Sequence, residues 1–187
     1  MKRIIAWDPE DQWSKQPGFR RITTRKELFE AVQKGGAAKL AYVASGTNIK
    51  QEFDFWAGCA LFWGRYFGAC VAIGEEVADV TTPSKAPGNW GMLLRRGLKR
   101  GITIYALSQR WAEADKTAIG NATEFVCCAF SNDDDVVYMA RKTRIPVDQL
   151  AALRKVETAT TITCPFIRYE VSTSKIEHGK LSFTKKR

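Results

Sequence analysis

Acidic and amide side chains follow three apolar, strand-like runs of this sequence. Asp8 follows residues 4–7, Glu75 and Glu76 follow the run ending at Gly74, and Gln109 follows residues 102–107. In open α/β sheets, ligands bind at the carboxyl ends of the strands, so these side chains are expected to line one site. One carboxylate of such a pair can hold Mg²⁺ while the other orients a water molecule. The same pair can also be two exposed residues at a strand end that have no function.

A basic stretch without acidic residues covers positions 85 to 110. Its candidate binding residues are Arg95, Arg96, Lys99, Arg100 and Arg110. These arginines could clamp phosphates, and the whole stretch could face nucleic acid or an acidic protein. A solvated helix face explains the same pattern.

Six tryptophans are many for this length. Trp56 and Trp63 stand one heptad apart in a helical apolar pattern, which predicts that both are core residues. Trp13, Trp90 and Trp111 lie in or near loops beside the basic stretch, where they could contact a partner or stack on bases.

The scarcity of histidine and the pattern of the cysteines exclude several kinds of site. The one histidine, His178, lies in a polar turn, which argues against a Ser-His-Asp or Cys-His triad. Five cysteines without a CxxC pair argue against a disulfide framework and a zinc site. Cys127 and Cys128 lie within a predicted strand, where packing is the expected role.

Composition predicts a globular chain with anionic partners. The 187 residues hold 29 Lys and Arg against 20 Asp and Glu, a net charge of +9. The longest apolar run, residues 55–64, is too short to span a bilayer, and residues 1–8 do not resemble a signal peptide. We therefore expect no membrane partner. The cysteine pattern indicates a reducing compartment, and the cytoplasm is the expected location.

Short apolar runs alternate with helical patterns, which predicts an α/β layer fold with a parallel sheet. Strands are expected at residues 4–7, 40–43, 70–73, 102–107 and 124–130. Helices are expected from a Thr24 capping box to Gly35, and at residues 50–67, 89–100, 133–144 and 146–155. Residues 161–183 read as an antiparallel hairpin appendage.

Three segments together resemble phage-encoded P-loop ATPases of the HerA/FtsK lineage, a group of DNA-pumping and packaging motors. They are residues 4–10, residues 71–81 and residues 101–110, the last followed by Asp115-Lys116-Thr117. The resemblance covers about residues 1–130. It implies that Glu75 is the Walker B acidic residue and ligates Mg²⁺ when nucleotide binds, that Glu76 is the catalytic glutamate, and that Gln109 ends the fourth core strand of the family.

One departure from that family concerns the phosphate-binding loop. Gly-x-x-x-x-Gly-Lys-Ser/Thr does not occur in these residues, and the only Gly-Lys pair, Gly179-Lys180, precedes Leu181 in the tail. The chain starts where the second strand of the family would start. The absent strand is expected between residues 70–75 and 102–108, and we expect those two strands to pair directly or to be joined by this chain's own residues.

The expected architecture is one domain over residues 1–187, with a three-layer P-loop-NTPase-like core (RecA/HerA type, first strand missing) at 1–130 and helices and a β appendage at 131–187. The first functional hypothesis is a non-catalytic basic module, without cofactor, that binds nucleic acid or a host nucleoprotein complex, for example as a phage inhibitor of host defence. The alternative is a DNA packaging or translocation motor that uses Mg²⁺-ATP. Another chain, a neighbouring subunit of an oligomer or an upstream segment would then supply its P-loop.

Overall fold

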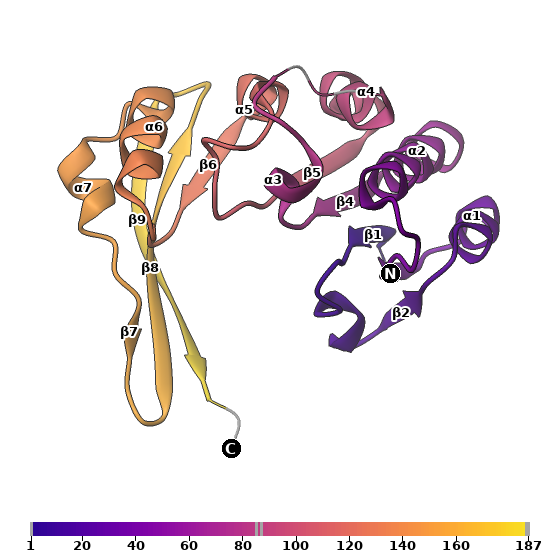
Figure 1. Ribbon diagram of the computed structural model, residues 1–187, viewed down its shortest axis with the longest axis horizontal. Helices are drawn as coiled ribbons and strands as arrows, with labels where there is room; N and C mark the ends of the chain where they lie inside the picture. The colour runs from indigo at the N-terminus through magenta and orange to yellow at the C-terminus, as the bar shows by residue number, and fades with distance from the viewer. Residues whose placement is uncertain (1, 85, 87, 186–187) are drawn as a thin grey trace. The chain divides into compact units, whose positions relative to one another are not determined.

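The computed structural model describes residues 2–84, 86 and 88–185, which form two compact units (Figure 1). The first unit contains residues 1–108 and 113–121, and the second contains residues 109–112 and 122–187. The sequence predicted one domain with a change of character near residue 131. In the structure, the residues from Ala122 onward form a compact unit with its own sheet and core. The single domain stays a prediction.

The first unit is built on a five-stranded sheet in which every pair of neighbours is parallel. In spatial order the strands are β2 (Phe19–Ile22), β3 (Lys39–Tyr42), β1 (Ile4–Trp7), β4 (Cys70–Gly74) and β5 (Ile102–Ala106). Four of these strands were predicted. The strand β2 was missed because Arg20 and Arg21 interrupt its apolar pattern.

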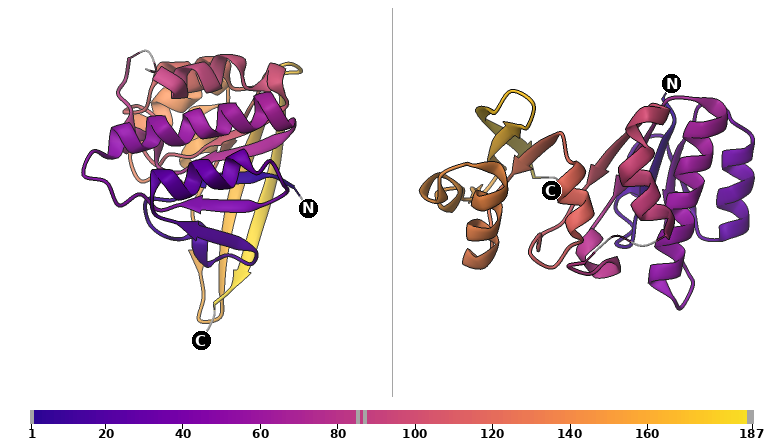
Figure 2. Two further views of the ribbon diagram at one scale, coloured as in Figure 1. Left: turned by 90° about the vertical axis from the view of Figure 1, so that its right-hand side faces the viewer. Right: turned by 90° about the horizontal axis from the view of Figure 1, so that it is seen from above.

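Three helices cover one face of this sheet, as the right-hand view of Figure 2 shows. They are α1 (Arg25–Gln33), α2 (Ile49–Phe67) and α4 (Gly88–Arg96). The predicted Thr24 capping box is confirmed, because the Glu27 N–H donates to the Thr24 hydroxyl at 3.3 Å. The unit is completed by η1 (Trp13–Lys15), α3 (Val77–Val80), η2 (Leu98–Arg100) and α5 (Lys116–Asn121).

The core of the first unit is aromatic. Trp7, Phe53, Trp56 and Trp90 are buried and stack or tilt against one another, with ring centroids 5.0–6.2 Å apart. Gly74, the last residue of β4, lies beneath the Trp56 and Trp90 rings, where a Cβ atom would be 3.6 Å from each. Trp56 and Trp63 are both fully buried, as predicted.

The strands β4 and β5 pair directly, from Cys70 opposite Ile102 to Gly74 opposite Ala106. Direct pairing was one of the expected outcomes and is confirmed. The direct pairing leaves no position between these two strands for the strand that is absent relative to the family. The strand β5 forms one edge of the sheet instead, so a further strand could be added only beside β5 or at the opposite edge, β2.

The second unit holds an antiparallel sheet and two helices. Strands β6 (Glu124–Cys127) and β7 (Val156–Glu157) both pair with β8 (Thr161–Glu170), which also forms a hairpin with β9 (Lys175–Thr184). The hairpin was predicted. The strand expected at 124–130 is shorter, and it belongs to this sheet and not to the parallel one.

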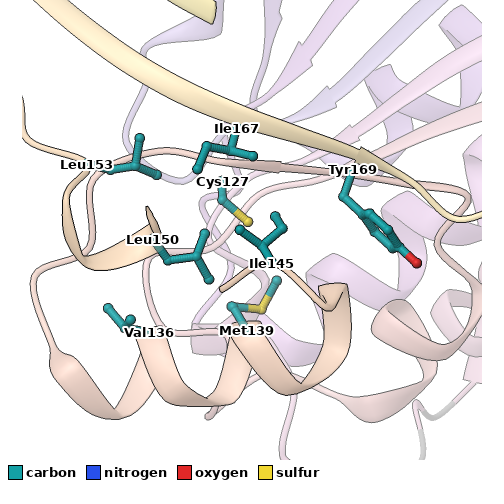
Figure 3. Packing of buried hydrophobic residues seen from close by; sticks show 8 residues of the cluster. All are labelled: Cys127, Val136, Met139, Ile145, Leu150, Leu153, Ile167 and Tyr169. Carbon is teal, nitrogen blue, oxygen red and sulfur yellow. The ribbon is translucent and has the colours of Figure 1, made fainter. Parts of the chain in front are cut away.

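Helices α6 (Asp133–Thr143) and α7 (Val147–Ala151) pack on one face of that sheet (Figure 3). Their buried side chains meet Cys127, Ile167 and Tyr169 from the strands, with Leu150 fully buried in the cluster. This second apolar core is why the unit is compact by itself.

No helix in the described part of the chain is long and apolar enough to cross a bilayer.

Candidate functional site

Glu75 and Glu76 are located at the carboxyl end of β4, where the parallel sheet meets the short helix α3. Glu76 has left-handed backbone angles, φ 45° and ψ 56°, which are uncommon for a residue with a side chain and cost about 1–3 kcal/mol. The Ser108 hydroxyl, located just past β5, donates to Glu76 Oε1 at 3.2 Å. Two neighbouring strands thus fix the direction of this carboxylate.

Glu75 lies in an environment that disfavours its charged form. Burial raises the pKa of this carboxyl, and the nearby carboxylates of Asp8, Glu10 and Glu76 raise it further, while a hydrogen bond from the Trp13 side chain acts in the opposite direction. Its Oε2 atom is buried and has no hydrogen-bond partner among the described residues. An unpartnered buried carboxylate oxygen is the kind of atom that a bound cation would satisfy.

Asp8 has a structural role next to this pair. It is fully buried, and its two oxygens accept three backbone N–H groups, from Gln12 at 2.7 Å, Trp13 at 3.1 Å and Ser14 at 2.9 Å. Asp8 thereby folds the loop after β1 back over the strand end. The same loop places Trp13 within reach of Glu75.

The described residues contain no group of three or more histidine, cysteine or acidic side chains arranged to hold a metal ion. Glu75, with its free oxygen, fits the role of a single protein ligand to Mg²⁺. Such a site is usual for Mg²⁺, which keeps several waters and takes its remaining ligands from substrate phosphates.

Gln109 and Arg110 belong to the segment that the structure assigns to the second unit. Arg110 Nε contacts the buried carboxylate of Asp135 at 2.9 Å, and the other oxygen of Asp135 accepts the Ala112 N–H at 3.0 Å. Arg110 therefore holds its own segment to α6 within the second unit. The predicted role of Gln109 at the nucleotide remains a prediction.

The three predicted partner-binding tryptophans occupy three different places. Trp90 is 1% exposed, and its indole N–H donates to the buried Asp115 at 2.9 Å, so the expectation that it stacks on a partner is wrong. Asp115 also caps α5 by accepting the Ala118 N–H. Trp111 packs against the apolar core of the second unit. Trp13 is half-buried and packs on Phe19.

The remaining basic residues that were predicted to bind a partner lie at the end of α4 and in η2. Arg95, Arg96 and Lys99 are exposed, and Arg100 is half-buried. The predicted helix over 89–100 is interrupted at Gly97, which lies so close to Leu93 that a Cβ atom would be 2.5 Å from its carbonyl oxygen. Lys85, the first cation of the basic stretch, lies outside the described residues.

Two site-building residues escaped the sequence analysis. Asp54, in α2, accepts the N–H groups of Asn89 at 2.7 Å and Trp90 at 3.3 Å and so caps α4. Ser108 was noted only as a strand end, yet it orients Glu76. None of these three hydrogen bonds has a signal in the sequence, because each joins residues more than thirty positions apart.

Comparisons with known proteins identify relatives among viruses. No family model matches the chain. It is 26% identical over 130 residues to protein P9 of Pseudoalteromonas phage PM2, an alignment that covers 70% of this chain and 58% of that protein.

Among solved structures, the genome packaging NTPase B204 of Sulfolobus turreted icosahedral virus 2 aligns over 95% of this chain and 81% of its own in its complex with AMPPCP. The TM-score is 0.71 and the sequence identity 12%. Its complex with ATP-gammaS gives a TM-score of 0.70 at 13% identity over the same shares. B204 of Sulfolobus turreted icosahedral virus, described as a DNA-packaging ATPase, gives 0.67 at 12% identity and covers 95% of this chain and 82% of its own.

These likenesses show the fold. The chain has the P-loop-NTPase-like α/β architecture of a viral packaging ATPase, together with an antiparallel hairpin sheet, as the sequence predicted.

Proposed function

We propose that this chain contributes the acidic part of the nucleotide site of a viral genome-packaging NTPase that acts on DNA. The observation that carries the proposal is the Glu75–Glu76 pair at the carboxyl end of β4, in a fold shared with an NTPase solved with ATP analogues. The phosphate-binding loop comes from polypeptide outside these 187 residues, either from the same protein or from another chain.

Each carboxylate has a distinct part in this proposal. Glu76, held by Ser108, orients the attacking water and accepts its proton. Glu75 presents its unpartnered Oε2 atom to the cation. Mg²⁺ bound with ATP supplies charge neutralisation of the phosphates. The raised pKa of Glu75 means that its carboxylate gains more from a neighbouring cation than an exposed carboxylate would.

The free edge of β5 supports the proposal that another strand completes the site. Leu107 N–H donates to the Gly74 carbonyl at 2.8 Å, and peptide groups alternate in direction along a strand. Ile104 and Ala106 therefore direct their peptide groups away from β4, and no strand of the described residues pairs with that side. A parallel strand added there would end beside the carboxyl end of β5, next to Ser108 and Glu76.

A second candidate function, a non-catalytic nucleic-acid-binding module, is favoured by the exposed cations Arg95, Arg96 and Lys99. This function needs no nucleotide. The two candidates therefore differ in whether the function depends on the carboxylate of Glu76.

The test compares ATP hydrolysis by the packaging complex purified from infected cells through a tag on this chain, with and without Glu76→Gln. We expect a loss of about a hundredfold or more in the rate for Glu76→Gln, because glutamine cannot accept the proton. Glu30→Gln, on the exposed face of α1, is the matched control and should hydrolyse at the wild-type rate.

Unchanged hydrolysis by the Glu76→Gln complex would overturn the proposal and leave the binding module as the better candidate. Calorimetric titration of the isolated 187-residue chain with Mg²⁺-ATP separates the contributions of its own residues from those of its partners. We expect no detectable heat up to millimolar ATP, because these residues contain no loop that would hold the phosphates.

A further inference from the structure

Four segments of the first unit meet at the amino edge of the parallel sheet, opposite Glu75 and Glu76. Arg3 Nε donates to the Gly35 carbonyl at 2.8 Å, and Val71 N–H donates to the Arg3 carbonyl at 2.9 Å. Cys70 N–H donates to the Gly101 carbonyl at 3.3 Å. The start of β1, the end of α1, the end of α2 and the turn before β5 therefore form one continuous surface.

Each of these segments contributes cations to that surface. We call it the amino-edge surface and define it by Arg3, Lys34, Arg65, Arg96, Lys99 and Arg100. All are exposed except Arg3 and Arg100, which are half-buried. The segments 2–7, 34–42, 64–74 and 95–106 contain no aspartate or glutamate.

Compensation of helix dipoles explains only part of this charge. The carboxyl-terminal ends of α1, α2 and α4 lie at this edge, and each carries about half a negative elementary charge. These partial charges are small beside the cations that define the surface. In the part of the chain that the structure describes, no carboxylate forms an ion pair with any of the six.

We infer that the amino-edge surface binds the phosphate backbone of duplex DNA. A surface with many cations and no carboxylates fits a regularly spaced polyanion, and protein–DNA interfaces are distinguished by such positive charge. The inference rests on the proposed function for the choice of DNA, but it does not involve the nucleotide site. The DNA contact is then on the opposite edge of the sheet from Glu75 and Glu76.

The test measures the affinity of the full chain for a fluorescently labelled DNA duplex by anisotropy across a range of salt concentrations. The variant carries Arg65→Gln, Arg96→Gln and Lys99→Gln, all exposed side chains. The control carries Lys15→Gln, Lys26→Gln and Lys50→Gln, which removes the same charge from exposed lysines near the opposite edge. Circular dichroism confirms that both variants are folded.

We expect the slope of log affinity against log salt to become less negative in the amino-edge variant. The change should be about one for each DNA phosphate that the variant no longer neutralises. Its affinity at physiological salt should fall about tenfold or more, and the control should stay close to wild type. Equal reductions in both variants would show that net charge alone attracts DNA and would overturn the inference. So would wild-type binding by the amino-edge variant, and that result would point to an acidic protein as the partner.

The two proposals fail in different assays. The proposed function alone would be contradicted by two results together. The amino-edge variant would lose DNA binding, and the Glu76→Gln complex would hydrolyse ATP at the wild-type rate. Loss of hydrolysis in Glu76→Gln with no effect of the amino-edge variant on DNA would contradict the further inference alone.

Discussion

At the scale of single residues, the two carboxylates after β4 differ in their hydrogen bonding. Glu76 is tied to Ser108, whereas one oxygen of Glu75 is buried without a partner among the described residues. A stable protein rarely keeps such an atom, and those that persist are often found where a ligand or ion completes the bonding. We therefore expect the charged carboxylate of Glu75 to lower the stability of the folded protein while serving its function.

Glu75→Gln should increase the free energy of unfolding relative to wild type at neutral pH. The pKa of Glu75 is raised in the folded state, above the value near 4.5 of a free glutamate, so the folded protein loses stability as pH rises from that value through the raised pKa. Glutamine does not titrate. Urea unfolding at about pH 4 and about pH 7 should show that the variant's advantage is larger at the higher pH, with Glu30→Gln as a control that shows no such change.

The residue types at the candidate site were predictable, and their surroundings were not. An apolar run followed by Glu75 and Glu76 indicates a strand end with carboxylates. The pKa of Glu75 is raised first by burial and then by Asp8, which the pairing of β1 with β4 brings close. Trp90 was predicted to lie in or near a loop, whereas contacts with Phe53, Trp56 and Asp115, all distant in sequence, bury it.

At the scale of elements, the buried Glu52 of α2 joins α1 by an ion pair and β3 by a hydrogen bond. Arg25 Nε donates to both oxygens of the buried Glu52, at 3.1 and 3.0 Å, and the Tyr42 hydroxyl donates to Glu52 Oε2. Burial raises the pKa of Glu52, but the hydrogen bonds from Arg25 and Tyr42 lower it by more, so the net shift is downward. Burial and the bond to Glu52 also raise the pKa of Tyr42.

Glu52→Gln should destabilise the protein at neutral pH by about 1 kcal/mol, because the charged partner of Arg25 is lost and Arg25 is partly exposed to solvent. A carboxyl with a lowered folded pKa stabilises the protein above the unfolded value near 4.5, and this contribution is lost as pH falls through the folded pKa. Chemical unfolding from about pH 7 to about pH 3 measures it. A gap between variant and wild type that stayed constant over this range would contradict the assignment.

Which strands form was largely predictable, but which sheet each strand joins was not. Largely apolar runs form the strands Ile4–Trp7, Cys70–Gly74 and Ile102–Ala106. Their parallel pairing follows from the helices between them. The run at Glu124–Cys127 looks the same locally. It pairs with β8, more than thirty residues later, and nothing in the run itself specifies that partner.

At the scale of the whole molecule, two apolar cores predict two cooperative units. Leu150 is fully buried within the cluster that joins α6 and α7 to the antiparallel sheet. Leu150→Ala should cost about 2–5 kcal/mol by leaving a cavity there.

Hydrogen exchange locates that destabilisation. Amide protection should decrease in β6, β8 and α6, while β1 and β4, which belong to the other core, keep their protection. Equal decreases throughout the chain would mean that the molecule unfolds as a single cooperative unit.

The amino-edge surface has cations and no carboxylates, whereas Asp8, Glu10, Glu75 and Glu76 lie towards the carboxyl ends of the strands, which gives the first unit an electric dipole moment along its strands. Near a polyanion, a body with such a moment experiences a torque before it makes any contact, and the positive end turns inward. A chain approaching DNA in this way would arrive with the amino ends of its strands leading. The carboxyl end of β4 would then face away from the DNA, accessible to a small molecule diffusing in from solution.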